Sequence, residues 1–219
     1  MTRRTGMATT DNQRSIAKYR GKAAGYDAST RPTWPIRMRC IELLQLCPGD
    51  TVLDVGCGTG LSFEPLLQRV GKRGRLLAFE QSPEMHALAQ ARAQALSAQG
   101  WQIELWLASA EEINLSAPAD AVLCHYVHDI SRSPAALDNL LGQIRPGARL
   151  VIAGMKFFPW YLAPLNLLAW LKNRPYNVHG HELARPWRLI EARLQGFRTQ
   201  ATQFGMGYIG VGTVPGGPA

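Results

Sequence analysis

The chain has 219 residues, of which 46% are hydrophobic and 18% charged, and its formal net charge is +8. A chain of this size and composition can bury a proper core, and we expect one domain. The four cysteines lack a C-x-x-C spacing, which argues against a metal site and a disulfide framework and predicts reduced thiols. The first residues are polar and basic rather than apolar, which predicts a cytoplasmic protein without a signal peptide.

Most of the excess charge lies near the N-terminus. Residues 1–40 contain nine Lys or Arg residues and only two acidic ones. A solvated helix is the simpler explanation, and attraction of nucleic acid, anionic lipid or an anionic substrate is the alternative. Because neither an aromatic-interleaved RNA motif nor a zinc-finger spacing accompanies this charge, we do not expect nucleic acid as a partner. Peripheral membrane contact stays open.

Strand and helix patterns alternate along the chain. Helical patterns at 14–30 and 34–46 come first. Apolar runs then predict buried strands at 51–57, 75–80, 101–108, 120–126 and 149–155, and helical patterns lie at 61–70, 82–99 and 133–144. We expect a turn at 145–148 and a glycine turn at 205–207 between two final strands. This order predicts an α/β fold with a parallel sheet covered on both faces.

The stretch VLDVGCGTG, residues 52–60, places Asp54 directly before a glycine-rich loop. The first strand is expected to end at Val55, so the loop lies at the edge of the sheet where open α/β folds bind ligands. Glycines permit a tight turn and a close approach of ligand to backbone. Glu80 ends the next strand, where a carboxylate can accept hydrogen bonds from both ribose hydroxyls. Together these features predict a nucleoside site.

The spacing and charge of the loop narrow the choice of nucleoside. Gly56, Gly58 and Gly60 give G-x-G-x-G rather than the dinucleotide G-x-G-x-x-G, and no lysine follows as in a Walker loop. Asp54 would repel a phosphate but favours a ligand with a positive end. S-adenosylmethionine carries a sulfonium and a free amine and no phosphate. A nicotinamide-dependent oxidoreductase is the rival, but no tyrosine has the lysine four residues on that the short-chain type needs.

The stretch VLDVGCGTG closely resembles the first motif of class I S-adenosylmethionine-dependent methyltransferases. The stretches LLAFEQSPEM, ASAEEINL, DAVLCHYVHDI and LLGQIRPGARLVIAG are similar to their later motifs, in the same order, over residues 36–155. The most similar subgroup is that of small-molecule enzymes related to quinone-biosynthesis C-methyltransferases. The resemblance implies a Rossmann-like, doubly wound sheet of seven strands, mostly parallel with an antiparallel C-terminal hairpin.

The resemblance also implies S-adenosylmethionine as the cofactor. Glu80 would bind the ribose, while Ser109 and Ala110 would face the adenine. Tyr19 and Tyr26 resemble aromatic residues of an N-terminal helix that closes over the cofactor. The expected cofactor-binding residues are Tyr19, Tyr26, Asp54, Gly56, Cys57, Gly58, Thr59, Gly60, Glu80, Gln81, Met85, Ser109, Ala110 and His125.

A polar cluster after the fourth expected strand, CHYVHD, is the candidate reaction site. The catalytic candidates are His125, Tyr126 and His128, as contacts to the transferred methyl group or as a general base. The simpler interpretation is a loop network in which His128 and Asp129 cap the next helix. Since methyl transfer displaces an activated sulfonium in line, positioning supplies much of the rate with or without a base.

An uncharged, aromatic-rich segment at 157–171 follows the fifth expected strand, and it is too short for a membrane span. It could be ordinary core, a membrane-surface element or an apolar cover over the substrate, and the resemblance favours the cover. His179 and His181 form only a weak metal pattern, so no metal is expected. The expected substrate-binding residues are Tyr126, Lys156, Phe158, Trp160 and Tyr161.

We therefore expect one domain in four parts: a basic arm and lid helix (1–35), a cofactor-binding core (36–155), a substrate-covering insertion (156–195) and a C-terminal hairpin and tail (196–219). The predicted function is transfer of a methyl group from S-adenosylmethionine to a small, apolar or aromatic acceptor by in-line displacement. A lipid or quinone methyltransferase at the membrane surface and a non-catalytic S-adenosylmethionine-binding protein are the alternatives.

Overall fold

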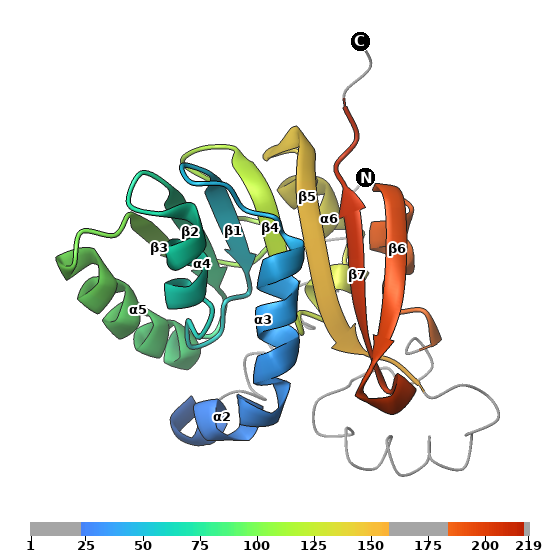
Figure 1. Ribbon diagram of the computed structural model, residues 1–219, viewed down its shortest axis with the longest axis horizontal. Coiled ribbons are helices and arrows are strands. Elements are labelled where there is room, and N and C mark those ends of the chain that lie inside the picture. The colour runs from blue at the N-terminus through green and yellow to red at the C-terminus, as the bar shows by residue number, and fades with distance from the viewer. Residues whose placement is uncertain (1–22, 158–183, 217–219) are drawn as a thin grey trace, which may run out of the picture.

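A seven-stranded sheet in the order β3-β2-β1-β4-β5-β7-β6 forms the centre of the protein (Figure 1). The structure is a computed structural model, and it describes residues 23–157 and 184–216. Neighbouring strands from β3 to β5 are parallel, whereas β7 is antiparallel to β5 and β6, which confirms the predicted sheet. The strands are β1 (Thr51–Val55), β2 (Arg75–Glu80), β3 (Ile103–Leu107), β4 (Ala119–His125), β5 (Ile144–Met155), β6 (Gln195–Thr202) and β7 (Gly207–Thr213).

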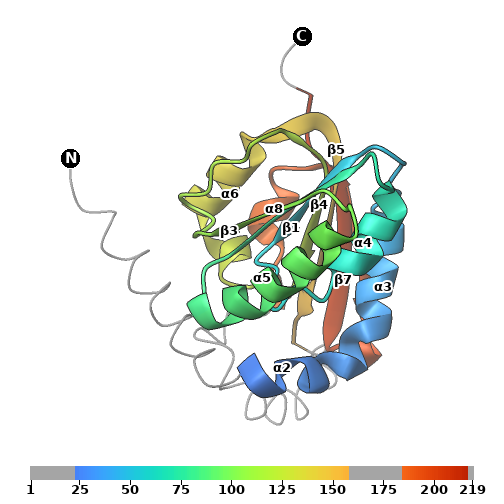
Figure 2. The same ribbon diagram turned by 90° about the vertical axis from the view of Figure 1, so that its left-hand side faces the viewer.

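Helices cover both faces of the sheet (Figure 2). Buried side chains of α3, α4 and α5 form one apolar cluster with the sheet, and those of α6 and α8 form the other. The helices are α2 (Ala23–Thr30), α3 (Trp34–Leu43), α4 (Phe63–Val70), α5 (Pro83–Ala98), α6 (Pro134–Leu141) and α8 (Arg188–Glu191). Short 3-10 turns are η1 (Arg31–Thr33), η2 (Ile130–Arg132) and η5 (Gln203–Gly205).

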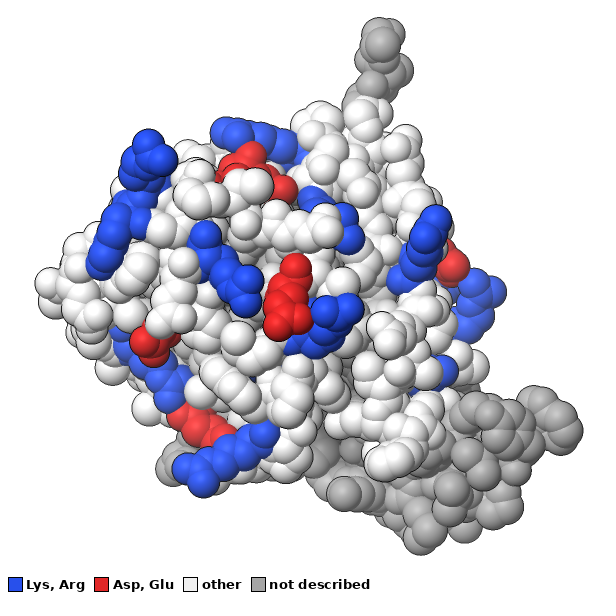
Figure 3. Space-filling view, in the orientation of Figure 1, with Lys and Arg blue, Asp and Glu red and all other residues white. Residues whose placement is uncertain are grey.

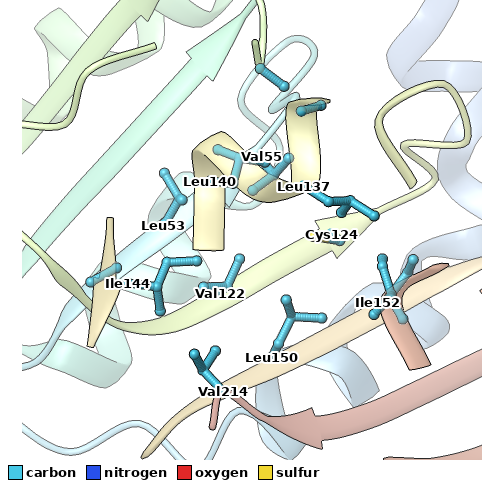
Figure 4. Packing of buried hydrophobic residues seen from close by; sticks show 14 of the residues in the cluster. Leu53, Val55, Val122, Cys124, Leu137, Leu140, Ile144, Leu150, Ile152 and Val214 are labelled. Carbon is cyan, nitrogen blue, oxygen red and sulfur yellow. The ribbon is translucent and has the colours of Figure 1, made fainter. Parts of the chain in front are cut away.

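Successive residues of the central strands face opposite layers, as the period of two in a strand requires. Leu53 and Val122 pack in the cluster that contains α6 (Figure 4), whereas Val52 and Leu123 pack in the cluster that contains α3 and α4. Because both faces of these strands are buried, their sequences are nearly continuous apolar runs. Asp54 interrupts the run in β1, and it shares the face of Val52, which is the face that α3 and α4 cover.

Serine side chains begin two helices at the predicted positions. Ser82 Oγ accepts a hydrogen bond from the backbone N–H of Met85 at 3.4 Å, and Ser133 Oγ accepts one from Ala136 at 3.2 Å. Each hydroxyl satisfies a backbone donor that has no partner within its own helix. These contacts confirm the predicted starts of α5 and α6.

The predicted turn at 145–148 is wrong, because β5 already begins at Ile144. The register of β5 explains the difference: Ala119 pairs with Ile144 and Ala121 with Arg149, so the strand bulges between the two pairs. Gly147 has a φ of 83° and takes the left-handed conformation within this bulge. The glycine that suggested a turn therefore bends a strand.

Several predicted features lie outside the described residues. They are most of the basic arm, most of the insertion, and the side chains Tyr19, Phe158, Trp160, Tyr161, His179 and His181. The division into four parts stays a prediction. Across residues 23–157 and 184–216, no helix combines the length and the apolar character that crossing a membrane requires.

Charged side chains are interleaved on the face shown in Figure 3, where Lys and Arg lie singly or beside Asp and Glu. Ion pairs of the described part of the chain include Arg75–Glu104 (3.4 Å) and Arg39–Glu42 (3.1 Å). On the described part of this face, the charge does not gather into a single basic stripe of the kind that tracks a phosphate backbone.

Leu123 and Leu88 provide a matched test of the core. Leu123 in β4 is fully buried, whereas Leu88 in α5 is 40% exposed. We expect Leu123→Ala to lower the free energy of unfolding by about 2–5 kcal/mol, because it leaves a cavity under α3 and α4. Leu88→Ala should cost less than about 1 kcal/mol. Urea denaturation of the two variants checks this, and equal losses would contradict the placement of Leu123 in the core.

Candidate functional site

A cavity of about 410 Å³ opens at the carboxyl ends of the parallel strands. The strands β1 and β4 are neighbours in the sheet, but the chain continues from them to helices on opposite faces. The cavity lies at this point, which is where open α/β sheets bind ligands. The structure brings ten of the predicted site residues to its walls. They are Tyr26, Gly56, Gly58, Glu80, Gln81, Met85, Ala110, His125, Tyr126 and His128.

The glycine loop forms the floor of the cavity. Gly56 and Gly58 have φ angles of 57° and 60°, which residues with a side chain adopt at a cost. A Cβ added to Gly56 would lie 2.8 Å from Cγ1 of Val127, in the loop that follows β4. A Cβ on Gly58 would lie 3.8 Å from the ring of Tyr26 and would project into the cavity region. The glycines therefore serve both the turn and the close packing of the two loops.

Glu80 is held at the end of β2 by backbone donors. Its Oε2 accepts from the N–H of Gly58 at 2.9 Å and its Oε1 from the N–H of Ser82 at 2.8 Å. Burial raises the pKa of this carboxyl, and the backbone N–H groups of Ser82, Gly58 and Gln81 counteract that rise. A carboxylate offers about four acceptor sites, so Glu80 can still accept from a ribose hydroxyl beside these backbone donors.

Asp54 and Arg37 form a buried polar network beneath the loop. Asp54 is 2% exposed and Arg37 only 7%. Arg37 donates a short hydrogen bond to Oγ of Ser62, and Ser62 in turn is hydrogen-bonded to Asp54. Oδ2 of Asp54 is buried without a hydrogen-bond partner among the described residues. Burial raises the pKa of Asp54 to about 7, although the charge of Arg37 and the Ser62 hydroxyl lower it.

His125, the last residue of β4, and Tyr126, which follows it, both line the cavity. The backbone of Tyr126 has a φ of 61°, fixed by an N–H···O bond of 2.8 Å to Ala153 in β5. The two rings meet edge to face with centroids 4.7 Å apart. Burial and the charge of Arg37 hold the pKa of His125 well below its usual range, so the imidazole is neutral. Its Nε2 is buried and has no partner in the described part of the chain.

His128 is an acceptor rather than a helix cap. Its Nε2 accepts from the backbone N–H of Met155 at 3.3 Å, which places the ring proton on Nδ1. Burial, with the charge of Arg132, lowers the pKa of His128 to about 4. The turn that follows, η2, has no side-chain capping bond at Asp129. The interpretation of His128 and Asp129 as a helix cap is therefore wrong, because the imidazole is engaged with the end of β5.

Helix α2 forms one wall of the cavity and is fixed to the core by a polar cluster, here called the α2 clasp (Asp27, Thr59 and Arg92). The Thr59 hydroxyl donates to Asp27 at 2.7 Å, Arg92 donates to the Thr59 carbonyl at 2.7 Å, and Arg92 also pairs with Asp27. From Gly25 to Thr30 no side chain of α2 is buried. The clasp is therefore a polar attachment of this helix to the loop after β1 and to α5.

Other predicted residues lie beside the cavity rather than on its wall. Ser109 donates to Glu112 at 3.3 Å, and Thr59 belongs to the clasp. Lys156 lies with its ammonium 6.0 Å from the centroid of the Trp187 ring. The predicted residues absent from the cavity wall, among those described, are Asp54, Cys57, Thr59, Gly60, Ser109 and Lys156. Asp54 is not part of the wall; it is buried next to the lining residue Gly56, with Oδ2 unpartnered among the described residues.

Sequence reasoning missed two groups of functional residues. Arg37 could have been found from its spacing, because it shares the buried face of α3 with Cys40 and Ile41, where a charge needs a reason. The second group is Gln203 and Met206, in the turn between β6 and β7, which line the cavity although they are far from β4 in sequence. No local pattern marks these two residues, since only the order of the strands in the sheet brings their turn close to the end of β4.

The residues present fit S-adenosylmethionine. Glu80 suits the ribose, and the buried, unpartnered oxygen of Asp54 suits an amine. Arg37 supplies a positive charge at the cavity wall that suits a carboxylate. The glycine loop carries no lysine for a phosphate. The site therefore matches a nucleoside that carries an amino acid.

Comparisons with known proteins agree with this geometry. Residues 52–147 match the family described as "Methyltransferase domain". Protein-L-isoaspartate O-methyltransferase 1 of Arabidopsis thaliana is 33% identical over 115 residues, covering 52% of this chain and 50% of that protein. The ubiquinone biosynthesis O-methyltransferase of Xanthomonas campestris is 25% identical over 184 residues, covering 70% and 74%. The structure of N-methyltransferase NodS from Bradyrhizobium japonicum in complex with S-adenosyl-l-homocysteine has a TM-score of 0.57 at 15% identity, covering 95% and 99%.

Fold, site and comparisons support one class: residues 52–147 match a methyltransferase domain, and the sheet and the cavity agree with a class I S-adenosylmethionine-dependent methyltransferase that takes S-adenosylmethionine as its cofactor. The chain spans about half the length of the first of these relatives. The resemblance found in the motifs is confirmed for the core.

Arg92→Met tests the α2 clasp. Since exposed ion pairs contribute about 0.2–1 kcal/mol, we expect amide hydrogens of residues 23–30 to exchange about two- to fivefold faster, with β4 unchanged. Arg75→Met is the matched control, because it removes a partly exposed ion pair away from α2. Hydrogen exchange read by mass spectrometry distinguishes the two. Equal exchange of 23–30 in both variants would show that the clasp does not hold the helix.

Proposed function

We propose that this protein transfers a methyl group from S-adenosylmethionine to a small acceptor with an apolar or aromatic body. One observation carries the proposal: the glycine loop, Glu80 and Tyr126 converge on a single cavity from the ends of three neighbouring strands. The first two suit the donor, and Tyr126 lies between the donor side and the side that β5 and β7 form.

The donor is held by groups of opposite charge. Asp54 and Glu80 accept hydrogen bonds from the amine and the ribose, and Arg37 faces the carboxylate. Met85 and Ala110, both buried at the cavity wall, supply apolar contacts to the adenine. The cofactor supplies a methyl group on a positively charged sulfur, which an acceptor attacks in line.

The residues near the reacting atoms act by orientation and exclusion of water. His125 and His128 are neutral, and their lowered pKa values make them poor proton acceptors at neutral pH. Tyr126 keeps its proton because burial, together with the nearby Cys40, raises its pKa to about 12. None of the three is suited to remove a proton from a weakly acidic acceptor. Positioning is the contribution these side chains can make.

The acceptor side of the cavity supports an apolar or aromatic substrate. Met155 and Met206 line it, and methionine sulfur packs well against aromatic rings. A relative named for ubiquinone biosynthesis matches 184 residues of the chain and supports a ring-shaped acceptor. The insertion at 156–195 is proposed to cover this side.

Donor binding is tested by thermal unfolding with added ligands. S-adenosylhomocysteine at about 100 times its Kd should stabilise the protein by about 2.7 kcal/mol, whereas NADH should not change the melting temperature.

Glu80→Gln should weaken the binding of S-adenosylhomocysteine at least about tenfold in calorimetry, since one acceptor becomes a donor. Glu104→Gln, on the partly exposed edge strand β3, is the control. Stabilisation by NADH alone would overturn the assignment.

The raised pKa of Asp54 predicts pH-dependent donor binding. In the free protein this carboxyl takes up a proton as the pH falls through about 7, whereas an amine partner requires the ionised form. The pKa of Asp54 is higher in the folded than in the unfolded chain, so the unfolded chain ionises first as the pH rises. The contribution of Asp54 to the free energy of unfolding therefore falls between about pH 4 and pH 7. Affinity for S-adenosylhomocysteine should therefore rise with pH up to about 7, by at most about tenfold per unit for this one proton.

Asp54→Asn provides the check on that dependence. Calorimetry between pH 5.5 and 8 should give a slope for this variant that is smaller than the slope of the unaltered protein. Glu80 keeps its own raised pKa and can retain part of the slope, so the difference between the two proteins is the measurement. Identical slopes would remove Asp54 from contact with the amine.

A further inference from the structure

Four of the uncharged residues that line the cavity on the side away from Glu80 are here called the distal wall: Tyr126, Met155, Gln203 and Met206. They come from the ends of β4 and β5 and from the turn between β6 and β7. Glu80 lies at the end of β2, with β1 and β4 between it and β5 in the sheet. A donor held at Glu80 and the glycine loop therefore leaves this wall to the acceptor.

The polar groups of the distal wall face each other. The Tyr126 hydroxyl donates to Oε1 of Gln203 at 3.5 Å, a long hydrogen bond of the kind that tightens when a ligand joins it. With Oε1 occupied in this way, the Gln203 amide nitrogen presents N–H donors. The Tyr126 oxygen keeps a lone pair that can accept. The pair thus offers one donor and one acceptor next to each other.

The backbone holds Gln203 in place with unusual conformations. Gln203 and Phe204 have φ angles of 50° and 55°, in the left-handed region that costs residues with side chains about 1–3 kcal/mol. A Cβ on Gly207 would lie 2.8 Å from the side-chain oxygen of Gln203, so that glycine makes room for the carboxamide. The N–H of Lys156 donates to the carbonyl of Met206 at 2.8 Å and ties the turn to β5. The position of this carboxamide is therefore built into the hairpin.

A donor beside an acceptor, both neutral, selects a particular chemical group. A hydroxyl donates to the Tyr126 oxygen and accepts from the Gln203 amide, so it satisfies both. A carboxylate leaves the tyrosine lone pair facing negative charge, and an ammonium leaves the amide donors without an acceptor. The phenol stays protonated, and the charge of Arg37, which also acts on Tyr126, is assigned to the carboxylate of the donor, so neither ion finds a free counter-charge on the distal wall. Two methionines beside the pair suit an aromatic ring.

We propose that Gln203 determines acceptor specificity: together with Tyr126 it recognises a hydroxyl group on an uncharged aromatic acceptor. This rests on the proposed function, since it names the substrate class of the same site. Gln203 acts by binding, and it takes no part in breaking the carbon–sulfur bond.

Three naphthalenes of matched shape test the proposal. The probes are 2-naphthol, 2-methylnaphthalene and 2-naphthoate, titrated into protein saturated with S-adenosylhomocysteine so that no methyl transfer occurs. We expect 2-naphthol to bind at least about tenfold more tightly than either of the others, the value of one good hydrogen bond. Ligand-observed NMR gives the Kd of each.

The variants separate recognition from folding. Gln203→Leu and Tyr126→Phe should each reduce the preference for 2-naphthol over 2-methylnaphthalene to less than about threefold, while leaving the Kd of 2-methylnaphthalene unchanged. Gln200→Leu, the same substitution at an exposed position of β6, should keep the full preference. Retention of 2-methylnaphthalene binding shows that a variant is folded at the site.

The outcomes distinguish this proposal from the function on which it rests. Failure of S-adenosylhomocysteine to bind in calorimetry would overturn both. Normal S-adenosylhomocysteine binding with no affinity for 2-naphthol would overturn this proposal alone. Equal affinity for 2-naphthol and 2-methylnaphthalene, or a Gln203→Leu variant that keeps the preference, would also overturn this proposal and leave the proposed function standing.

Discussion

The close approach of the loop after β1 to the loop after β4 determines the shape of the site above it. At Gly56 there is no room for a Cβ beside Val127, so the two loops touch where the chain leaves neighbouring strands for opposite faces of the sheet. Parallel strands do not otherwise bring side chains of both layers to one place. With this contact made, Glu80 from β2 and Tyr126 from β4 can line the same cavity. The glycine is needed for packing as much as for its turn.

A second constraint is the burial of charge beneath that floor. Asp54 and Arg37 are both buried. Hydrogen bonds through the Ser62 hydroxyl link them, in place of a direct ion pair that would neutralise both charges. Burying charges in this way costs free energy that an apolar pair would not cost. A ligand that brings an amine and a carboxylate completes both ends of the network. In the free protein, the raised pKa of Asp54 has the same cause: the carboxyl is buried, and one of its oxygens lacks a hydrogen-bond partner among the described residues.

Most residues predicted for the donor side line one cavity, because their determinants are local. Asp54 and the glycines lie within one loop, and Glu80 follows one helix and one strand later, so an alternating pattern is enough to bring them together. The errors have long-range reasons, which lie in contacts with β5. Gly147 reads as a turn in sequence but bends β5, and the imidazole of His128 has a backbone partner across the sheet instead of a helix to cap.

The acceptor side could not be predicted in the same way, since it depends on long-range pairing. Gln203 lies 77 positions after Tyr126, and only the insertion of β7 between β5 and β6 brings its turn to the cavity. Arg37 is an intermediate case: its helical spacing was visible, but its partner Ser62 lies 25 positions on. The hydrophobic periodicity of a helix identifies the buried face on which such a residue lies, but it does not say which residue is its hydrogen-bond partner.

The two sides of the cavity also differ in how they accommodate left-handed backbone. The donor side uses glycine at 56 and 58, where the conformation costs little and the absent side chain leaves room. The acceptor side uses Tyr126 and Gln203, where the same conformation is costly although glycine would relieve it. The backbone alone does not require a phenol or a carboxamide at these positions. The backbone strain at these two residues, which the glycines of the donor side avoid, supports the proposal that their side chains recognise the acceptor.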